Sequence, residues 1–379
     1  MSEIHSWTDE HTARRVRQLT DLPDGAALPY FRLAKHVPDG SMLIHARHEK
    51  GGLMTLEPET GRLRPLPLGL EAHYLRLRAS DGRLWYYTGS DRSIWSIDLP
   101  AGRPELVMRL PADAPGFVAD MTCDGRVALL LEQDHDLKEY PIPTTKDVAT
   151  FWRYINRPRS GRIWAVEAET GALGKLVETE GVCPSHVEAS PADPTLVRYC
   201  LDMYDAYGQR VWTVRTDGTQ HRKIRPQAYG ELVTHEFWWP DPSRIGYTYQ
   251  DRRGDETLSE RPWAEYSPRP THLGLADLDG NEVYLSEPLN CYHTHLYCSR
   301  DGRWISGEGT DGHSYVWAAP FSPDAGRIEM TALATVHTPY VPFRGQGVNC
   351  DFSADGRWLL YTDTVAGRHQ VLACRNDGP

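Results

Sequence analysis

Apolar residues in this chain occur in short alternating runs separated by tight turns, a pattern that predicts β-strands rather than helices. An Asp-Gly or Asp-Pro turn recurs along the chain, and each is followed by an apolar run such as SMLIHAR (41–47), LWYYTG (84–89) or WLLYTDT (358–364). Asp-Gly between apolar runs is a strong hairpin signal. The seven turns contain Asp39, Asp81, Asp124, Asp193, Asp241, Asp301 and Asp355.

Every unit then carries another strand and a second turn, as in RIWAVEAETG (162–171) and RVWTVRTDG (210–218). Because both kinds of turn recur in a fixed order, the chain is predicted to contain seven structural repeats. Four short strands in a repeat of this size are typical of a propeller blade. We therefore expect an all-β protein, with residues 1–379 forming a single seven-bladed β-propeller domain. An array of β-sandwiches or two separate domains is the alternative.

The two ends of the chain are predicted to meet in the last blade. The seventh unit ends at the C-terminus with its third strand, and the segment ARRVRQLTD (13–21) can supply the missing outer strand. Such pairing would close the ring and remove an exposed strand edge. Two long stretches, 132–161 and 250–270, are predicted to be loops on one face of the ring. Long loops on a rigid scaffold are often functional.

The register of the repeats predicts a cluster of polar side chains. If the innermost strand of each blade leads into the Asp turn, the residue six positions before that Asp lies near the start of the strand. Blades four to seven carry histidine or amide groups there, so these groups should converge around one half of the axial channel. Glu236, next to His235, should point the other way because side chains alternate along a strand. The seven positions hold Leu33, Leu75, Val118, Val187 with His186 beside it, His235, His295 and Asn349.

Composition and charge exclude several classes of function. The formal net charge is −11 and no Lys/Arg block stands out, so nucleic acid is not an expected partner. The N-terminal segment has no apolar core of the kind that secretory signals have, and no run is long enough to span a membrane. The seven cysteines are scattered, with no Cys-x-x-Cys pair. A cytoplasmic protein with reduced thiols is therefore expected.

The polar channel mouth suits an anionic ligand. Histidine and arginine side chains would create a positive pocket in an otherwise negative protein. Histidine also offers a base near neutral pH and a metal ligand. His295 could hold a divalent ion together with His293, Gln346 or Asn349. The alternative for each histidine is a hydrogen-bonded side chain in the core, and His293 lies where two blades connect and could face a neighbouring blade.

Three segments resemble the oligogalacturonate lyase family, a family of cytoplasmic, seven-bladed polysaccharide lyases. The resemblance extends over the whole chain, and it implies β-elimination of uronate-containing oligosaccharides. It also implies that His235 is the Brønsted base and that Arg210 binds the substrate carboxylate. We expect His186, Tyr207 and Arg344 to contribute to substrate binding as well. The segments are LVTHEFWWPDPSRIGYTY (232–249), QRVWTVRTDG (209–218) and THLYCSRDGRW (294–304).

The same resemblance implies a catalytic manganese ion with His295 as one ligand. In the family the remaining ligands come from a Gln-x-x-His-x-His stretch in the last blade. Here that stretch reads Gln346-Gly-Val-Asn349-Cys350-Asp351, so only the glutamine matches. One alternative is a weaker site for Mn²⁺ or another divalent metal that includes His293, Gln346 and Asn349. The other is that no metal binds and a cation such as Arg210 neutralises the carboxylate.

The sequence is also compatible with other functions. The Asp-Gly repeats are also similar to those of TolB-type propellers, which would make the protein a non-catalytic binder of sugars or proteins. A lyase for a divergent, glucuronate-type substrate is a further alternative. A propeller hydrolase would need a carboxylate pair or a nucleophile at the channel, and the matched positions offer neither. The expected partner is an acidic oligosaccharide, with no role for nucleic acid or a membrane.

Overall fold

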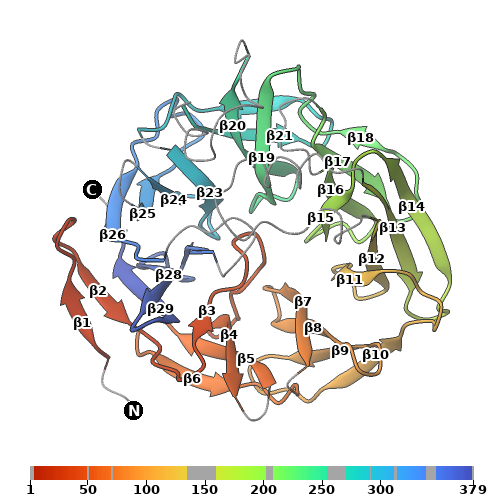
Figure 1. Cartoon of the computed structure of the whole chain (residues 1–379), viewed down its shortest axis with the longest axis horizontal. Helices are drawn as coiled ribbons and strands as arrows, with labels where there is room; N and C mark the ends of the chain where they lie inside the picture. The colour runs from red at the N-terminus through yellow and green to blue at the C-terminus, as the bar shows by residue number, and fades with distance from the viewer. Residues whose placement is uncertain are drawn as a thin grey trace.

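Seven antiparallel sheets form a closed ring in the computed structural model (Figure 1). Its described part is all-β, which confirms the predicted seven-bladed β-propeller. No helix with the length and apolar character of a membrane span occurs in the described residues. These residues are 4–48, 51–69, 71–134, 159–201, 208–253, 270–290, 292–310, 314–338 and 347–377.

Blades one to three follow one another along the chain, and the first strand of each lies nearest the axis (Figure 1). Blade one contains β3 (Ala26–Ala27), β4 (Met42–His48), β5 (Gly51–Glu57) and β6 (Arg62–Pro65). Blade two contains β7 (Ala72–Arg78), β8 (Arg83–Thr88), β9 (Ser93–Asp98) and β10 (Glu105–Arg109). Blade three contains β11 (Phe117–Met121), β12 (Val127–Asp134), β13 (Ser160–Glu167) and β14 (Leu173–Glu180).

Blades four to six repeat this arrangement. Blade four contains β15 (Pro184–Ala189), β16 (Leu196–Leu201), β17 (Val211–Arg215) and β18 (Arg222–Lys223). Blade five contains β19 (Glu231–Trp238), β20 (Arg244–Asp251), β21 (His272–Asp277) and β22 (Glu282–Leu285). Blade six contains β23 (Tyr292–Cys298), β24 (Trp304–Thr310), β25 (Ser314–Pro320) and β26 (Thr331–Thr335).

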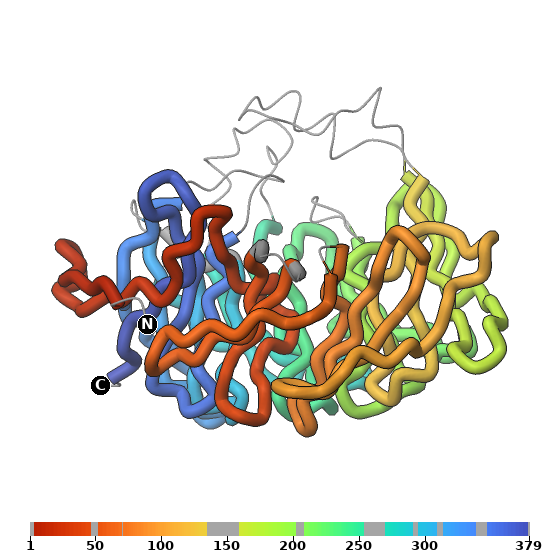
Figure 2. Tube along the Cα trace, turned by 90° about the horizontal axis from the view of Figure 1, so that it is seen from below, coloured from red at the N-terminus to blue at the C-terminus, as the bar shows by residue number. Residues whose placement is uncertain are grey.

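Blade seven joins the two ends of the chain. Its strands from the C-terminal part are β27 (Asp351–Phe352), β28 (Trp358–Val365) and β29 (Arg368–Arg375). Outside them lie β2 (Arg15–Gln18) and then β1 (Ser6–Thr8), so the sheet has the order β1-β2-β29-β28-β27. The red N-terminal segment therefore runs beside the blue C-terminal blade in Figure 2. The outer strand expected from segment 13–21 is β2, and β1 adds a further strand.

The turns between first and second strands have the chemistry that the sequence predicted. Gly82 and Gly125 have φ values of +78° and +75°, a region that glycine enters without a steric penalty. The Asp124 carboxylate accepts a hydrogen bond from the Arg126 backbone N–H at 3.1 Å, as Asx turns do. A Cβ atom on Gly125 would lie 2.8 Å from the Trp85 indole nitrogen. Packing against this neighbour therefore adds to the need for glycine there.

The apolar core lies between the blades rather than in one central mass. Each cluster joins two adjacent sheets, for example Leu43 and Leu53 of blade one with Leu77 and Leu84 of blade two. Alternate residues of a strand face opposite neighbours, so each sheet is covered on both sides. Tryptophans of the third strands lie in or against these clusters. They are Trp95, Trp164, Trp212 and Trp317.

The innermost strand of blade one is only Ala26–Ala27, which is as short as β27 of blade seven. Residues 28–35 continue as irregular backbone that reaches the middle of the ring before β4 begins (Figure 1). Leu33 therefore does not start a strand, contrary to the register expectation. The segment is fixed instead by buried polar contacts: Lys35 Nζ lies 3.0 Å from Asp351 of blade seven and donates to the Phe31 carbonyl at 2.9 Å.

Candidate functional site

The polar residues at the channel owe their direction to β-bulges in the innermost strands. The pairing of β15 with β16 shifts between Ser185 and Glu188, and that of β19 with β20 shifts between Thr234 and Phe237. Such a shift breaks the alternation of side chains. His186, His235 and Asn349 share a left-handed backbone with φ of +47°, +52° and +49°, which is unusual for residues other than glycine.

These shared φ values correct the register in blade four. The sequence placed Val187 at the matched position with His186 beside it, whereas His186 is the equivalent of His235 and Asn349. Val187 is buried in the cluster between blades three and four. The cause is one extra residue in the turn, because the closing backbone hydrogen bond runs from Ser190 to Leu196 but from Trp239 to Arg244 in blade five.

His235 and His295 lie side by side at the axis. Their ring centroids are 4.6 Å apart with an angle of 76° between the planes. Phe31 of the blade-one segment stacks on His295 at 4.6 Å, and the Tyr30 hydroxyl is 3.5 Å from His295 Nε2. The expected convergence of the two imidazoles is therefore observed. Tyr30 and Phe31 were not identified from the sequence, because an irregular segment offers no register from which to place them.

Two of the three imidazoles are oriented by a carboxylate. His295 Nδ1 contacts Glu308 Oε1, and Glu308 Oε2 accepts a hydrogen bond from the Asn349 backbone N–H at 2.9 Å. His186 Nδ1 lies 3.2 Å from Glu236 Oε1. His235 differs, since its buried Nδ1 has no hydrogen-bond partner among the described residues.

Burial is the main cause that lowers the pKa of His235 well below its usual value, and the neighbouring His295 and Arg210 add to it. The His235 imidazole is therefore neutral near pH 7. A neutral imidazole carries a lone pair on one of its two nitrogens, and that nitrogen can accept a proton. This is the chemical property that a base in the channel requires.

Glu236 points toward this cluster, so the expectation that it faces away is wrong. Its carboxylate is fully buried, and its Oε2 accepts a hydrogen bond from Arg210 Nε at 3.0 Å. Arg198 Nη1 lies 3.1 Å from its Oε1. Burial alone would raise the pKa of Glu236, but Arg210, His186 and Arg198 together hold it well below its usual range. The bulge at His235 explains the error, because a bulge cancels strict alternation.

A second acidic residue extends this network toward blade one. Glu188 accepts a hydrogen bond from Arg32 Nη1 at 2.8 Å and another from Arg198. Arg32 also lies over the Tyr30 ring, 5.6 Å from its centroid. Arginines 32, 198 and 210 and the carboxylates of Glu188 and Glu236 thus form one continuous buried chain of charges between the blade-one segment and blades four and five.

Several predicted site residues lie outside the part of the chain that the structure describes. Tyr207, Arg344 and Gln346 belong to this group, as do 135–158 and 254–269, which make up most of the two long loops. His293 is described only through its backbone, which pairs with Gly309 in blade six. The roles of these residues, and the domain extent of 1–379, stay predictions.

Some of the described side chains have atoms that could ligate a divalent metal ion. The contact of His295 Nδ1 with Glu308 is the carboxylate–histidine arrangement that orients many metal ligands and leaves Nε2 as the donor atom. Asn349 is engaged otherwise, since its Oδ1 accepts from the Phe31 backbone N–H at 3.2 Å and its Nδ2 donates to the Gly347 carbonyl. Among the described residues, His295 Nε2 is therefore the donor atom that fits an ion, whereas the Asn349 amide is held by Phe31 and Gly347.

A second group could in principle ligate a metal. Ligand atoms of His186, Cys200 and Glu236 lie within 4.8 Å of one another. Glu236 already contacts the Arg198 and Arg210 guanidinium groups, whose positive charges would repel a cation. The charge of the neighbourhood therefore favours His295 over this group.

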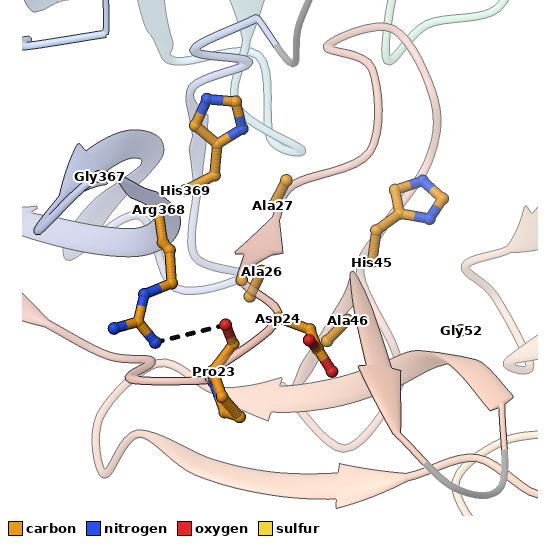
Figure 3. A pocket seen from close by; sticks show the side chains of 11 residues that line it. Pro23, Asp24, Ala26, Ala27, His45, Ala46, Gly52, Gly367, Arg368 and His369 are labelled. Carbon is orange, nitrogen blue, oxygen red and sulfur yellow. Dashed lines mark hydrogen bonds between the residues drawn. The ribbon is translucent and has the colours of Figure 1, made fainter.

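A cavity of about 470 Å³ lies elsewhere, between blades one and seven (Figure 3). His45 and His369 stand on either side of it, and Arg368 donates to the Pro23 carbonyl at 3.3 Å. None of the predicted site residues that the structure describes lines this cavity. It is therefore separate from the histidine cluster at the axis.

The chain is similar in sequence to a known protein family. The family model for oligogalacturonate lyase matches residues 4–313. An oligogalacturonide lyase of Pectobacterium atrosepticum is 26% identical over 316 residues, which is 81% of this chain and 76% of that protein. An oligogalacturonate lyase of Dickeya dadantii is 26% identical over 251 residues, 64% of this chain and 63% of that protein.

Solved structures agree with the fold. An oligogalacturonate lyase in complex with manganese has a TM-score of 0.73 at 21% identity, covering 98% of this chain and 96% of that one. The oligogalacturonate lyase of Vibrio parahaemolyticus has a TM-score of 0.74 at 19% identity, with the same coverage. At these identities the likeness shows a shared propeller fold.

Proposed function

The chain belongs to the oligogalacturonate lyase family of carbon–oxygen lyases, and we propose that it cleaves uronate-containing oligosaccharides by β-elimination at the histidine cluster. The observation that carries this proposal is the neutral, buried His235 imidazole, whose Nδ1 lacks a partner, beside Arg210 and His295. An acidic oligosaccharide fits the arginines of this region.

The proposed reaction begins at the carbon next to the uronate carboxylate. His235 accepts the C5 proton, and the electrons of the C–H bond form the C4–C5 double bond while the C4–O bond breaks. The glycosidic oxygen leaves with that electron pair and takes up a proton. Negative charge accumulates on the carboxylate as the proton is removed, so a cation placed there stabilises the transition state.

Arg210 is the proposed carboxylate clamp. Glu236 holds its Nε edge, so the guanidinium is fixed before a substrate arrives. Preorganised charge stabilises a transition state without further reorganisation. A divalent ion such as Mn²⁺, held by His295, would supply additional positive charge at the carboxylate. Glu308 orients His295 for this task, and Tyr30 and Phe31 limit the space around it.

We expect the His235→Ala variant to lose at least about 100-fold in the rate of elimination, because general bases contribute about 10²–10⁴-fold. The measurement is the ultraviolet absorbance of the unsaturated uronate formed from oligogalacturonates and oligoglucuronates. The enzyme is first treated with a chelator and then assayed with and without Mn²⁺. His221→Ala, which changes an exposed histidine, should retain full activity.

Full activity of His235→Ala would remove His235 as the base. If the wild-type protein binds oligouronates but forms no unsaturated product under either metal condition, the protein is a binding propeller instead. The same assay therefore separates the two functions that the sequence left open.

A further inference from the structure

We propose that Glu236 is a positioning residue that fixes Arg210 and His186 together, and that it thereby makes His186 Nε2 an acceptor for a sugar hydroxyl. The nature of the ligand rests on the proposed function, whereas the hydrogen-bonded geometry of Glu236 does not. The expected ligand is a polyhydroxylated acid. The Glu236 carboxylate fixes both the Arg210 guanidinium, which suits an acidic group, and the His186 imidazole, which can accept from a hydroxyl group.

The contacts of Glu236 are complete on both oxygens. Oε1 lies 3.2 Å from His186 Nδ1 and 3.1 Å from Arg198 Nη1, and Oε2 lies 3.0 Å from Arg210 Nε. The side chain of Glu236 has no exposed surface, so water does not compete for these positions. A fully buried carboxylate with three nitrogen partners is rigid, and rigidity is what a positioning residue needs.

The tautomer of His186 follows from the charge on Glu236. An ionised carboxylate can only accept hydrogen bonds, so the proton of the neutral imidazole must be on Nδ1. Nε2 then carries a lone pair. Burial, helped by the nearby Arg32 and Arg210, lowers the pKa of His186 although Glu236 opposes this shift, so the ring is neutral near pH 7. A histidine in this state accepts a hydrogen bond but cannot donate one at Nε2.

The accepting nitrogen is accessible. The His186 side chain is 28% exposed, compared with 13% for His295, and no described residue makes a hydrogen bond with His186 Nε2. The Tyr30 ring meets it edge-on at 6.0 Å, which connects His186 to the same cluster. His186 therefore stands at the rim of the site, where a hydroxyl group of a bound sugar can reach it.

Glu236 also has a structural role, because its negative charge neutralises the buried Arg198 guanidinium. An experiment must separate this role from the positioning of His186. Glu188 provides the matched control, since it is buried in the same chain of charges and also contacts Arg198, but it contacts no imidazole among the residues that the structure describes. Substitution of either Glu188 or Glu236 should thus reduce stability, whereas only substitution of Glu236 should change the tautomer of His186.

The first experiment measures the tautomers directly by nitrogen NMR of the full-length protein labelled at histidine. We expect His186 in the wild-type protein to be protonated at Nδ1. Glu236→Met, which removes both acceptor oxygens, should abolish that preference, and the matched Glu188→Met should preserve it. A wild-type His186 protonated at Nε2, or an unchanged tautomer in Glu236→Met, would overturn the proposal. This outcome does not depend on lyase activity, so it is independent of the proposed function.

The second experiment measures ligand affinity without turnover. Binding of an oligogalacturonate to the His235→Ala protein is followed by calorimetry, alone and combined with changes at position 186. Removing the acceptor in His186→Ala should weaken binding about tenfold, because the variant loses one hydrogen bond to the ligand. A tenfold change in affinity corresponds to about 1.4 kcal/mol. His186→Gln, whose amide oxygen can still accept, should recover most of the affinity.

Equal affinities of the Ala and Gln variants would contradict the acceptor role of His186. In the catalytic assay, Glu236→Met should lower kcat/KM by about 10–100-fold, as for other residues that orient an active-site group. If Glu236→Met does not fold, the tautomer of wild-type His186 and the affinities of the His186→Ala and His186→Gln variants still decide the question.

Discussion

Three residues with left-handed backbone set the direction of the side chains in the channel. His186, His235 and Asn349 each adopt a positive φ that costs on the order of 1 kcal/mol or more for a residue with a Cβ atom. The same strain at equivalent places in three blades is consistent with a function for the groups it aims. Glu236 follows one of these residues, and its buried contacts with Arg210 and His186 are a consequence of the same bulge.

A different histidine gives a stability prediction at the residue scale. Burial, with a smaller effect of His73, lowers the pKa of His45 to about 4. The unfolded chain binds this proton below about pH 6.5. Between these two values the unfolded state therefore holds more protons, and folding becomes less stable as the pH falls. We expect His45 to account for a loss on the order of 2 kcal/mol between pH 6.5 and 4.

Urea unfolding as a function of pH tests this expectation. His45→Gln should flatten the decline in that window, and His221→Gln, on the surface, should retain the wild-type curve. An unchanged slope in His45→Gln would show that the imidazole at position 45 is protonated equally easily in both states.

At the scale of an element, the segment of residues 28–35 replaces most of the innermost strand of blade one. It brings Tyr30, Phe31 and Arg32 against histidines and carboxylates of the opposite blades. Irregular backbone in the middle of a protein needs polar partners. Lys35 provides them, because its ammonium group contacts Asp351 and the carbonyls of Phe31 and Leu33.

Lys35→Met should destabilise the protein by about 3–5 kcal/mol, because it leaves the buried Asp351 carboxylate without its charge partner. The double variant Lys35→Met/Asp351→Leu should recover a large part of this loss. Lys175→Met, which removes an exposed lysine, should change stability by less than about 0.5 kcal/mol. Denaturant midpoints measure all three, and a stable Lys35→Met protein would mean that the segment is held by its apolar contacts alone.

At the scale of the whole molecule, the ring is closed by two strands from the N-terminal part of the chain. β2 pairs with β29, and Val16 of β2 is buried in the apolar cluster between blades six and seven. Without β2, the edge of β29 would be open to pairing with another chain. Closure therefore links the first residues of the sequence to the stability of the complete propeller.

Val16→Asp should lower the free energy of unfolding by at least about 3 kcal/mol and promote aggregation, because it places a charge in an apolar site at the closing strand. Arg15→Asp, with the same new side chain on the exposed face of β2, should cost less than about 1 kcal/mol. Thermal unfolding and light scattering measure both effects. Equal melting temperatures for the two variants would argue against closure through β2.

The sequence by itself determined the architecture and part of the site. Turn chemistry and alternation are local properties, so repeated Asp-Gly and Asp-Pro turns predicted the seven blades, and the register predicted that His235 and His295 would meet. It also predicted that segment 13–21 would complete the last blade, because an unpaired third strand needs a partner.

Only the tertiary structure decided the remaining features, because they depend on contacts between distant parts of the chain. The extra turn residue in blade four moved His186 into the matched position, and the bulge at His235 turned Glu236 into the site. The partnership of Glu308 with His295, and the arrival of Tyr30 from blade one, join residues that are far apart in sequence. Local periodicity carries no information about such pairs, since packing of the closed ring selects them.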